Sequence, residues 1–515
     1  MSTKEILSKL KPVTLSLDEK LISKDLKDAI PHLKKAMDAL NRIYLKQQDE
    51  KLPELYDKTM QGTDETLKDF FRAFNGPWNT LENYVSILPE TENRRPGCSF
   101  YPEDFDKKDF EKFTSTLSKA DQDRFLDHYT VVRKKAPGAY EAIPYHKYYE
   151  KDLKVLASHL EKASEIIKHP ELKAFLKERA ATLLTGDYRT SDSTWVKLKK
   201  TPLELIMGPF EVYDDAALGI KASYESMLMV VDQEKGAALS TIEQNIKHLA
   251  DYIPLPHGSK AAVGGLAPIT VVHEIYGTGE AAAGINASAF NLPNDPWVRK
   301  NVGWKQVMIY NIMQAKFENC TRRIAQKLVE GGDETRFESY FFTVLLHEVS
   351  HGLGPAYRQN GEPVSKCMGP QYTPVEEAKA DIGALYILLK CGDQYGIPRF
   401  APEVLLKSFL AGLFRSIRFG LHEAHGAANI VQFNWFMEHG TIEVKSDGRF
   451  VAKPHGLEKT TYELLEKLAT LEASATPEEA KAFLERYAKP TPVIEKAIAS
   501  LSDIPVDIRV TWPDL

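Results

Sequence analysis

The chain reads YFFTVLLHEVSHG from Tyr340 to Gly352. Apolar residues fill the first part of this stretch, and His347 and His351 follow four positions apart, with Glu348 between them. Positions four apart lie on one face of an α-helix, so both imidazoles can point at the same spot. Two converging imidazoles with an adjacent glutamate are typical of a catalytic zinc site, in which the glutamate acts on a bound water. The glycines after His351 predict that the helix ends there.

A catalytic zinc ion needs a third protein ligand, and a second segment offers carboxylates for that role. The chain reads TPVEEAKAD from Thr373 to Asp381, followed by a run of apolar residues that predicts a buried helix. Thr373 is a candidate N-cap, and Glu376 is its candidate capping-box partner at the positive end of the helix dipole. Glu377 and Asp381 lie four apart, so one could bind zinc while the other orients a histidine. The spacing alone does not choose between Glu376 and Glu377 as the ligand.

Composition limits the classes of function. The chain has 515 residues, of which 43% are hydrophobic and 27% charged, as in a globular protein of two to four domains. Its net charge of −6 argues against a nucleic-acid partner. Four scattered cysteines without a C-x-x-C pair fit a reducing cytoplasm. We expect neither a signal peptide nor a membrane-spanning helix, because the sequence lacks the long apolar runs that both require.

Hydrophobic periodicity divides the chain into three regions. Residues 1–185 follow a helical pattern, with apolar side chains at Leu26, Ile30, Leu33, Met37 and Leu40. The next region has strand-like runs, expected at 210–213, 224–231 and 268–276. The remainder is expected to be helical, with apolar segments at 305–330, 335–352, 373–391 and 401–440 and peripheral helices in 456–500.

The two motifs together resemble the dipeptidyl peptidase III family of metallopeptidases. The pattern Glu-Glu-x-Lys-Ala-Asp at 376–381 resembles the family's second zinc motif. The resemblance implies one zinc ion bound by His347, His351 and Glu377. It also implies that Glu376 and Asp381 support the histidines, and that Glu348 is the catalytic base.

The resemblance extends to segments outside the zinc motifs. These segments are Glu211-Val212-Tyr213, Asn291-Leu292-Pro293-Asn294 with the nearby Arg299, and Glu423-Ala424-His425-Gly426. In the family, the counterparts of Glu211, Asn291 and Asn294 bind the amino-terminal end of the peptide, and Arg299 belongs to the same substrate-binding segment. Tyr213 and His425 correspond to residues that stabilise the transition state.

The sequence departs from the family pattern in two respects. The family hallmark is a six-residue H-E-x-x-G-H, whereas this chain has the five-residue form, which permits a regular helix. Asp214, after Tyr213, and Asn429, four positions after His425, stand where the family has arginines.

The architecture that the resemblance implies is α+β and predominantly helical, with two lobes separated by a cleft. A mixed lobe with a small β-sheet or barrel would comprise 1–231 and 270–315 and bind the amino-terminal end of the peptide. A helical zinc-binding lobe would comprise 232–269 and 316–515. We expect closure of the cleft to assemble the catalytic residues.

The expected function is that of a zinc peptidase that releases dipeptides from the amino terminus of oligopeptides. Two alternatives stay open at this point. The first is an aminopeptidase, an oligopeptidase or a hydrolase of another amide. The second is a zinc-stabilised peptide-binding protein that has lost its activity, although a purely structural site would not need Glu348. The sequence leaves the oligomeric state open, and histidine and carboxylate ligands also accept cobalt or manganese.

Overall fold

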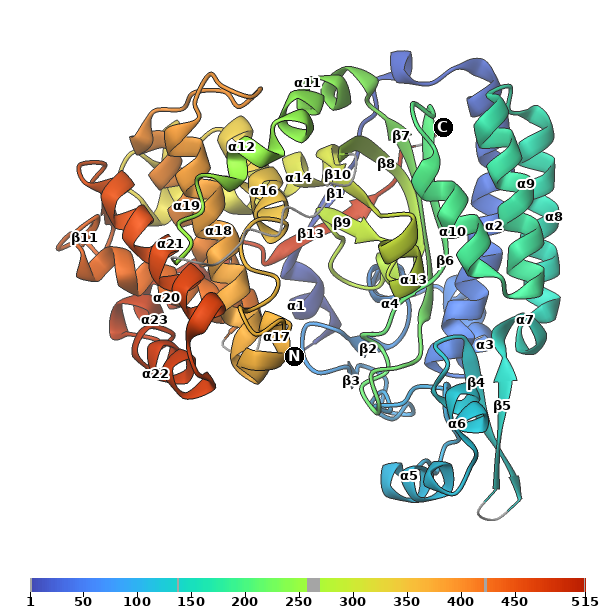
Figure 1. Ribbon diagram of the computed structural model, residues 1–515. Helices are drawn as coiled ribbons and strands as arrows, with labels where there is room; N and C mark the ends of the chain where they lie inside the picture. The colour runs from blue at the N-terminus through green and yellow to red at the C-terminus, as the bar shows by residue number, and fades with distance from the viewer. Residues whose placement is uncertain (1, 137–138, 257–268, 421–423, 514) are drawn as a thin grey trace. The chain divides into compact units, whose positions relative to one another are not determined.

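In the computed structural model, the described residues are 2–136, 139–256, 269–420, 424–513 and 515. The chain forms two compact units (Figure 1). Unit 1 consists of Met1–Gln233, Thr270–Ile312 and Arg509–Leu515, and unit 2 consists of Glu234–Ile269 and Met313–Ile508. Pro268, the first residue of one expected strand, lies outside the described residues, as does Glu423. The prediction of a predominantly helical α+β chain with a small sheet is confirmed.

Unit 1 is built on a long helix, α2 (Lys24–Gln48), whose apolar face is buried. The side chains at the helical spacing noted above are at most 2% exposed, from Leu26 to Leu40. α2 packs against α8 (Glu150–Ile166), which packs in turn against α9 (Pro170–Thr185), as the blue and teal helices of Figure 1 show. The periodicity of α2 therefore places one face of the helix in the core.

A five-stranded sheet forms the other layer of unit 1, in the order β6-β7-β8-β10-β9. Its strands are β6 (Leu203–Glu211), β7 (Ser223–Val231), β8 (Ile269–Gly279), β9 (Ala289–Leu292) and β10 (Lys305–Ile309). β6 and β7 form an antiparallel pair in which Leu203 lies opposite Val230 and Glu211 lies opposite Ser223. All of β7 is buried, and α2 packs against it. The segment between β6 and β7 carries Tyr213.

Unit 2 is a helical body around α16 (Phe337–His351) and α18 (Tyr372–Lys390). α16 packs against α18, and α18 also packs against α20 (Ala424–Glu438) and α21 (Leu457–Ser474). α19 (Pro402–Ile417) packs against α20 and α16. α22 (Pro477–Tyr487) and α23 (Pro492–Ser500) follow α21.

A glycine permits the close approach of α16 and α18. A Cβ atom on Gly383 would lie 3.0 Å from the Ser350 hydroxyl oxygen and 3.2 Å from its Cβ. These distances are shorter than ordinary van der Waals contacts, so a larger residue at 383 would push the two helices apart. Gly383 therefore allows the middle of α18 to lie against the last turn of α16.

Four expectations from the sequence are wrong in detail. The segment 305–330 begins as strand β10, because a short apolar run does not distinguish a buried strand from a buried helix. The strand expected at 210–213 is the end of β6, and Tyr213 follows it in a turn. α18 begins at Tyr372 with Gln371 as its N-cap, so Thr373 lies inside the helix and caps nothing. α21, expected to be peripheral, buries ten residues against its neighbours.

The last residues of the chain belong to unit 1, whereas the sequence analysis placed all of 316–515 in the helical lobe. Strand β13 (Asp507–Thr511) pairs with β1 (Leu10–Thr14). The Leu15 amide donates to the Thr511 carbonyl at 3.0 Å, and Arg509 forms an ion pair with Asp69 at 3.0 Å. These contacts join sequence-distant segments, so periodicity along the chain does not reveal them.

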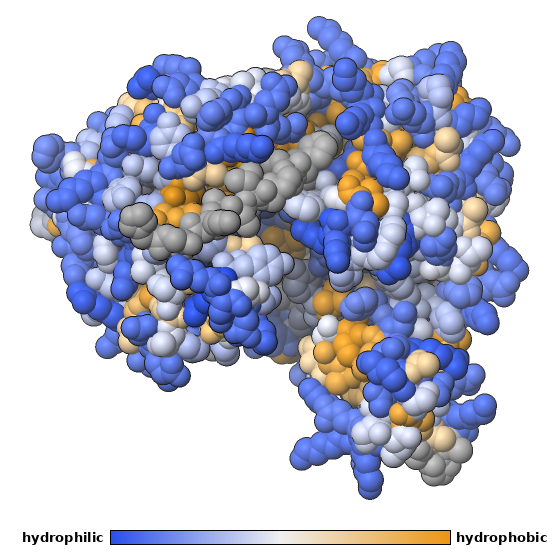
Figure 2. Space-filling view, in the orientation of Figure 1, coloured by the Kyte–Doolittle hydropathy of each residue, from blue (hydrophilic) through white to orange (hydrophobic). Residues whose placement is uncertain are grey.

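Hydrophilic side chains predominate on the face shown in Figure 2. Among the described residues, Tyr213 is the most exposed large hydrophobic side chain, with 76% of its area accessible. Within that part of the chain, no helix combines the length and apolar character needed to cross a bilayer.

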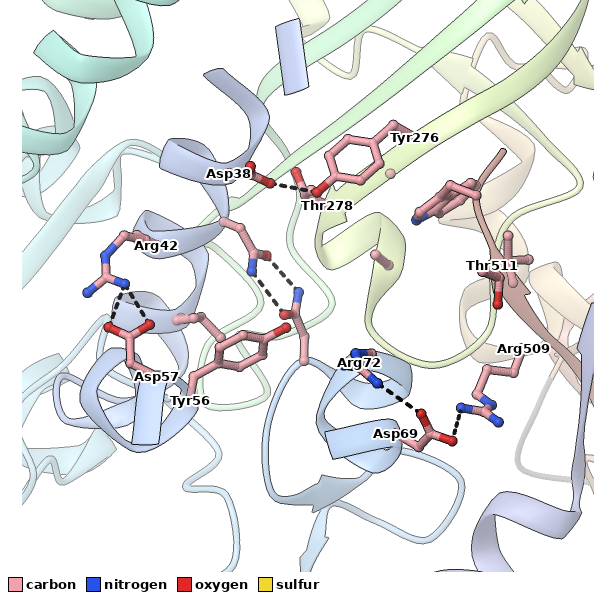
Figure 3. Close-up of a pocket in the computed structure, with 17 residues that line it drawn as sticks. Asp38, Arg42, Tyr56, Asp57, Asp69, Arg72, Tyr276, Thr278, Arg509 and Thr511 are labelled. Carbon is pink, nitrogen blue, oxygen red and sulfur yellow. Dashed lines mark hydrogen bonds and ion pairs between the residues drawn. The ribbon is translucent and has the colours of Figure 1, made fainter. Parts of the chain in front are cut away.

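Unit 1 also holds a cavity of about 570 Å³ beside α2, lined by residues other than the predicted site residues. Figure 3 shows that Asp38 in its wall accepts a hydrogen bond from the Tyr276 hydroxyl, whereas the other charged side chains form ion pairs. Arg42 contacts both carboxylate oxygens of Asp57, and Asp69 bridges Arg72 and Arg509. The charges of these five residues therefore largely compensate one another within the wall.

Candidate active site

The two histidines of α16 converge as their spacing predicts. His347 Nε2 and His351 Nε2 lie 3.0 Å apart. The helix ends at His351, and Gly352 is its C-cap. His347 is buried, whereas 31% of the His351 side chain is exposed. One face of the last helical turn thus presents two ring nitrogens at a single point.

The opposite nitrogen of each ring is held by a carboxylate from α18. His347 Nδ1 lies 2.7 Å from Asp381 Oδ1, and His351 Nδ1 lies 2.8 Å from Glu376 Oε1. An ionised carboxylate only accepts hydrogen bonds, so the ring protons belong on the two Nδ1 atoms. Each Nε2 atom is then left with a lone pair directed at the other.

Glu377 brings a third electron-rich atom to the same point. Its Oε2 lies 3.4 Å from His347 Nε2 and 3.6 Å from His351 Nε2. This oxygen is buried and accepts no hydrogen bond from the described residues. An acceptor buried without a donor is costly, and a cation would remove that cost.

The spacing of these three atoms fits a zinc ion. Zinc binds imidazole nitrogen and carboxylate oxygen at about 2.0–2.2 Å in a tetrahedral arrangement, which places neighbouring ligand atoms about 3.3 Å apart. The three observed separations are 3.0, 3.4 and 3.6 Å. A metal ion held by these three atoms would have the number of protein ligands that is typical of catalytic zinc, which keeps a fourth position for water.

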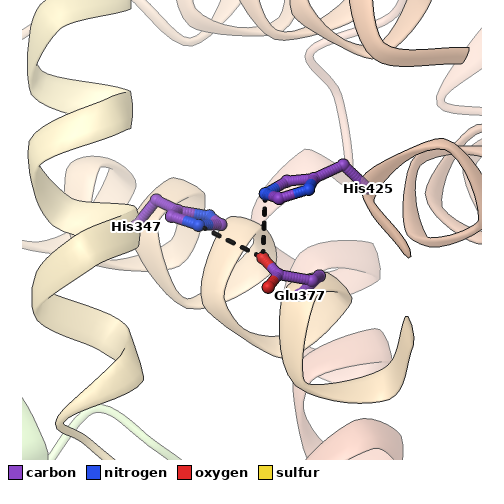
Figure 4. A group of neighbouring side chains, drawn as sticks. All are labelled: His347, Glu377 and His425. Carbon is purple, nitrogen blue, oxygen red and sulfur yellow. Dashed lines mark ion pairs between the residues drawn. The ribbon is translucent and has the colours of Figure 1, made fainter. Parts of the chain in front are cut away.

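His425 offers a second combination of ligands. His347, Glu377 and His425 each present a candidate ligand atom, and these atoms lie within 4.8 Å of one another (Figure 4). His425 Nε2 is 3.2 Å from Glu377 Oε2, and 49% of its side chain is exposed. We favour His351 over His425 as the ligand, because a carboxylate on Nδ1 fixes the His351 ring with its Nε2 directed at the site.

The carboxylates around His347 determine which protonation state of its ring is favoured. Burial lowers the pKa of His347, but the charge and hydrogen bond of Asp381, together with Glu377 and Glu348, raise it well above its ordinary value. The carboxylates therefore favour a positive charge at this position. A bound metal ion supplies that charge in place of a second ring proton.

Glu348 lies beside the converging atoms and is half-buried. Among the described residues, its carboxylate has no hydrogen-bond or ion-pair partner. The other carboxylates of the site, Glu376 and Asp381, are each engaged by a histidine. Glu348 is thus the acidic group of α16 that remains free to accept a proton.

Two amides from α20 support Asp381. Asn429 Nδ2 donates to Asp381 Oδ2 at 3.0 Å, and Gln432 Nε2 donates to the same oxygen at 2.8 Å. Asn429 stands where the related family has an arginine, and here it orients the carboxylate that holds His347. Sequence reasoning missed Gln432, whose side chain is fully buried in the structure.

The predicted substrate-binding residues gather in unit 1. Asn294 Nδ2 donates to the Phe210 carbonyl at 3.3 Å, next to Glu211 at the end of β6. Arg299, on α13 (Pro296–Asn301), donates to the Pro293 carbonyl at 3.2 Å. Burial raises the pKa of Glu211, while Asn294 and Arg299 oppose that rise.

Asn291 and Asp214 have contrasting surroundings. Asn291 lies on β9 opposite Gln306, and its side-chain oxygen is buried without a hydrogen-bond donor among the described residues.

Asp214 is buried, forms an ion pair with Arg94 and accepts a hydrogen bond from Gln48 Nε2 at 2.8 Å. The residue after Tyr213 thus points into the core and stabilises the segment that carries the tyrosine.

The sequence matches the family model of peptidase family M49 over residues 127–366, which include the Glu211 segment and the H-E-x-x-H motif. Among solved structures, it is similar to DPP III from Caldithrix abyssi, with 32% identity, a TM-score of 0.93, and coverage of 99% of this chain and 98% of that chain. DPP III from Corallococcus sp. strain EGB is 29% identical, with a TM-score of 0.83 over 99% of this chain and 96% of that chain.

Two curated proteins also match. Nudix hydrolase 3 from Arabidopsis thaliana is 28% identical over 573 residues, covering 100% of this chain and 74% of that protein. Dipeptidyl peptidase 3 from Nematostella vectensis is 23% identical over 210 residues, covering 40% of this chain and 28% of that protein. The name of the Arabidopsis protein disagrees with the family model and both solved structures, and about a quarter of that protein lies outside the match.

Proposed function

This chain belongs to peptidase family M49 and is a metallopeptidase of the dipeptidyl peptidase III type, and from this premise we propose that it is a zinc enzyme that releases dipeptides from the amino terminus of oligopeptides. The observation that carries the zinc assignment is the convergence of two ring nitrogens and one carboxylate oxygen at separations that suit zinc ligands. These atoms are His347 Nε2, His351 Nε2 and Glu377 Oε2.

We assign the metal to His347, His351 and Glu377, and the support of the two histidines to Asp381 and Glu376. The chemistry that zinc supplies when bound is polarisation of the scissile carbonyl and a lower pKa for the attacking water. The Nδ1 hydrogen bonds hold both rings in one orientation and would leave the two Nε2 atoms available to bind the metal ion.

Glu348 is the proposed general base. Its free, half-buried carboxylate would accept the proton of the attacking water and later give it to the leaving amine. Tyr213 and His425 are the proposed donors to the developing oxyanion, since their side chains are 76% and 49% exposed and carry an O–H and an N–H group. Loss of one such donor typically lowers the rate by about 10²–10³-fold.

Glu211, Asn291, Asn294 and Arg299 are proposed to bind the amino-terminal end of the peptide. The Glu211 carboxylate would pair with the ammonium group of the substrate, and that pair is strengthened where Glu211 is partly buried. The amide groups of Asn291 and Asn294 would bind the first peptide units. Because such a pocket would require a free amine, the enzyme would cleave at a fixed distance from the amino terminus of the peptide.

We propose a cytoplasmic location for the enzyme. Cys98, Cys320, Cys367 and Cys391 are all free thiols, and Cys367 alone of the four is not buried. Free thiols fit a reducing compartment.

The test of the proposed function is product analysis with two matched peptides. One is an oligopeptide with a free amine, and the other is the same peptide acetylated at its amino terminus. Mass spectrometry should detect dipeptides from the first peptide, in order from its amino terminus, and no cleavage of the second. Equal cleavage of both peptides, or release of single amino acids, would contradict the proposed specificity.

A further inference from the structure

The two histidines of the metal site are supported in different ways. Asp381, which holds His347, is bonded by the neutral amides of Asn429 and Gln432. Glu376, which holds His351, is instead bonded by an ammonium group, since Lys379 Nζ lies 2.9 Å from Glu376 Oε1. The second arrangement places the positive charge of Lys379 next to the carboxylate that holds His351.

Lys379 is buried at unusual depth for a lysine, with 2% of its area exposed. Its Nζ donates to the Leu353 carbonyl at 2.9 Å, immediately beyond the C-cap of α16. A Cβ atom on Gly354, where φ is +113°, would lie only 3.4 Å from this nitrogen. The same ammonium thus contacts the carboxylate that holds the His351 ring and the backbone two residues beyond His351.

A second carboxylate also lies near the lysine. Glu472 of α21 is fully buried, and its Oε2 is 3.9 Å from Lys379 Nζ. Among the described residues, no N–H group or hydroxyl donates to either Glu472 oxygen, and the Glu472 carboxyl interacts with that of Glu376. Burial raises the pKa of Glu472 well above its ordinary value, despite the charge of Lys379.

We propose that Lys379 is a positioning residue for the metal: its ammonium holds Glu376 and the end of α16 together, and thereby fixes His351 as a ligand. Glu472 is the buried acid that shares this ammonium and keeps it between α18 and α21. The inference rests on the proposed function, because it concerns the metal that the function requires. Lys379 touches no substrate and acts only through Glu376 and the backbone of α16.

The test compares variants by zinc affinity rather than by activity alone. Competition with a chelating dye gives the dissociation constant for Zn²⁺, and thermal unfolding of the metal-free protein gives its stability. K379M leaves two buried carboxylates without a cation and is expected to destabilise the fold. The double variant K379M/E472L removes the unpaired acid, and its metal-free stability is expected to return towards that of the wild type.

The expected result separates a positioning role from a structural role. K379M/E472L should bind Zn²⁺ about 10–100-fold more weakly than the wild type, as is typical when a group behind a metal ligand is lost. K379R keeps the charge and should recover most of the affinity. K390M, which removes an exposed lysine from the end of the same helix, should bind as the wild type does.

Wild-type affinity in K379M/E472L would overturn the inference and leave the proposed function intact. A wild-type protein that binds no Zn²⁺ would overturn the proposed function itself.

Discussion

His347 Nε2 lies 3.0 Å from His351 Nε2, although a carboxylate already holds the Nδ1 atom of each ring. With both protons on Nδ1, this pair brings two lone pairs together beside a third from Glu377. A cation among these three atoms stabilises the arrangement, and a bound metal ion would supply its charge in place of a second ring proton on His347. The relationship between the two histidines is therefore the structural basis of the metal assignment.

Replacement of Glu348 by glutamine should separate catalysis from metal binding. E348Q keeps the size of the side chain but removes the base, so kcat should fall by about 10²–10⁴-fold while the zinc content stays unchanged. Steady-state kinetics and metal analysis of the same preparation check this expectation. E338Q, at an exposed position in the first turn of the same helix, is the matched control and should be fully active. Full activity in E348Q would show that another group takes the proton.

His351 and His425 should respond differently to replacement by alanine. H351A removes a proposed ligand and should lose most of the bound zinc. H425A removes a proposed oxyanion donor, so it should retain zinc while its rate falls by about 10²–10³-fold. Metal analysis of both variants distinguishes the two ligand sets. If H425A loses zinc and H351A keeps it, the group of His347, Glu377 and His425 holds the metal instead.

The side-chain amides of α20 should increase the zinc affinity of the site, although neither of them is a metal ligand. Q432A removes one of the two donors to Asp381 and should weaken zinc binding by about 10–100-fold. N434A is a matched control on the same helix, because Asn434 donates to the Tyr487 and Lys489 carbonyls and lies outside the site. N434A should lower the thermal unfolding temperature and leave the zinc affinity unchanged. Equal zinc affinities for Q432A and wild type would show that Asp381 does not depend on this hydrogen bond.

Activity on peptides with a free amine should depend on the ionisation of Glu211. Burial raises the pKa of Glu211 above the ordinary glutamate value of 4.5. As pH falls through this raised pKa, the carboxylate takes up a proton and loses its attraction for the substrate ammonium, so kcat/KM should fall at a pH above 4.5. The pH profile of kcat/KM for wild type and E211Q checks this, and the limb due to Glu211 should be absent from E211Q. An acidic limb that is identical in both proteins would assign it to another group.

Much of the metal site could be predicted from the sequence, because its residues are close together in the chain and lie on two helices. The spacing of His347 and His351 fixes their common face, and the acidic start of the next buried helix brings Glu376, Glu377 and Asp381. The choice between Glu376 and Glu377 needed the three-dimensional arrangement. Glu376 is occupied by His351 and Lys379, whereas Glu377 Oε2 is left without a donor.

The supporting residues were harder to predict, because their roles depend on contacts between distant segments. Gln432 and Glu472 reach the site from α20 and α21, and sequence separation hides both contacts. The expected cap at Thr373 failed for a related reason. A short helical turn, Gly369–Gln371, leads directly into α18, so the helix begins before the residue that resembles a cap.

The most direct test of the account is an anomalous difference map of crystals of the purified protein, recorded at the zinc absorption edge. The account predicts one strong peak at about 2.0–2.2 Å from His347 Nε2, His351 Nε2 and a Glu377 carboxylate oxygen. The absence of a peak at this position, or a peak bound by His425 in place of His351, would contradict it.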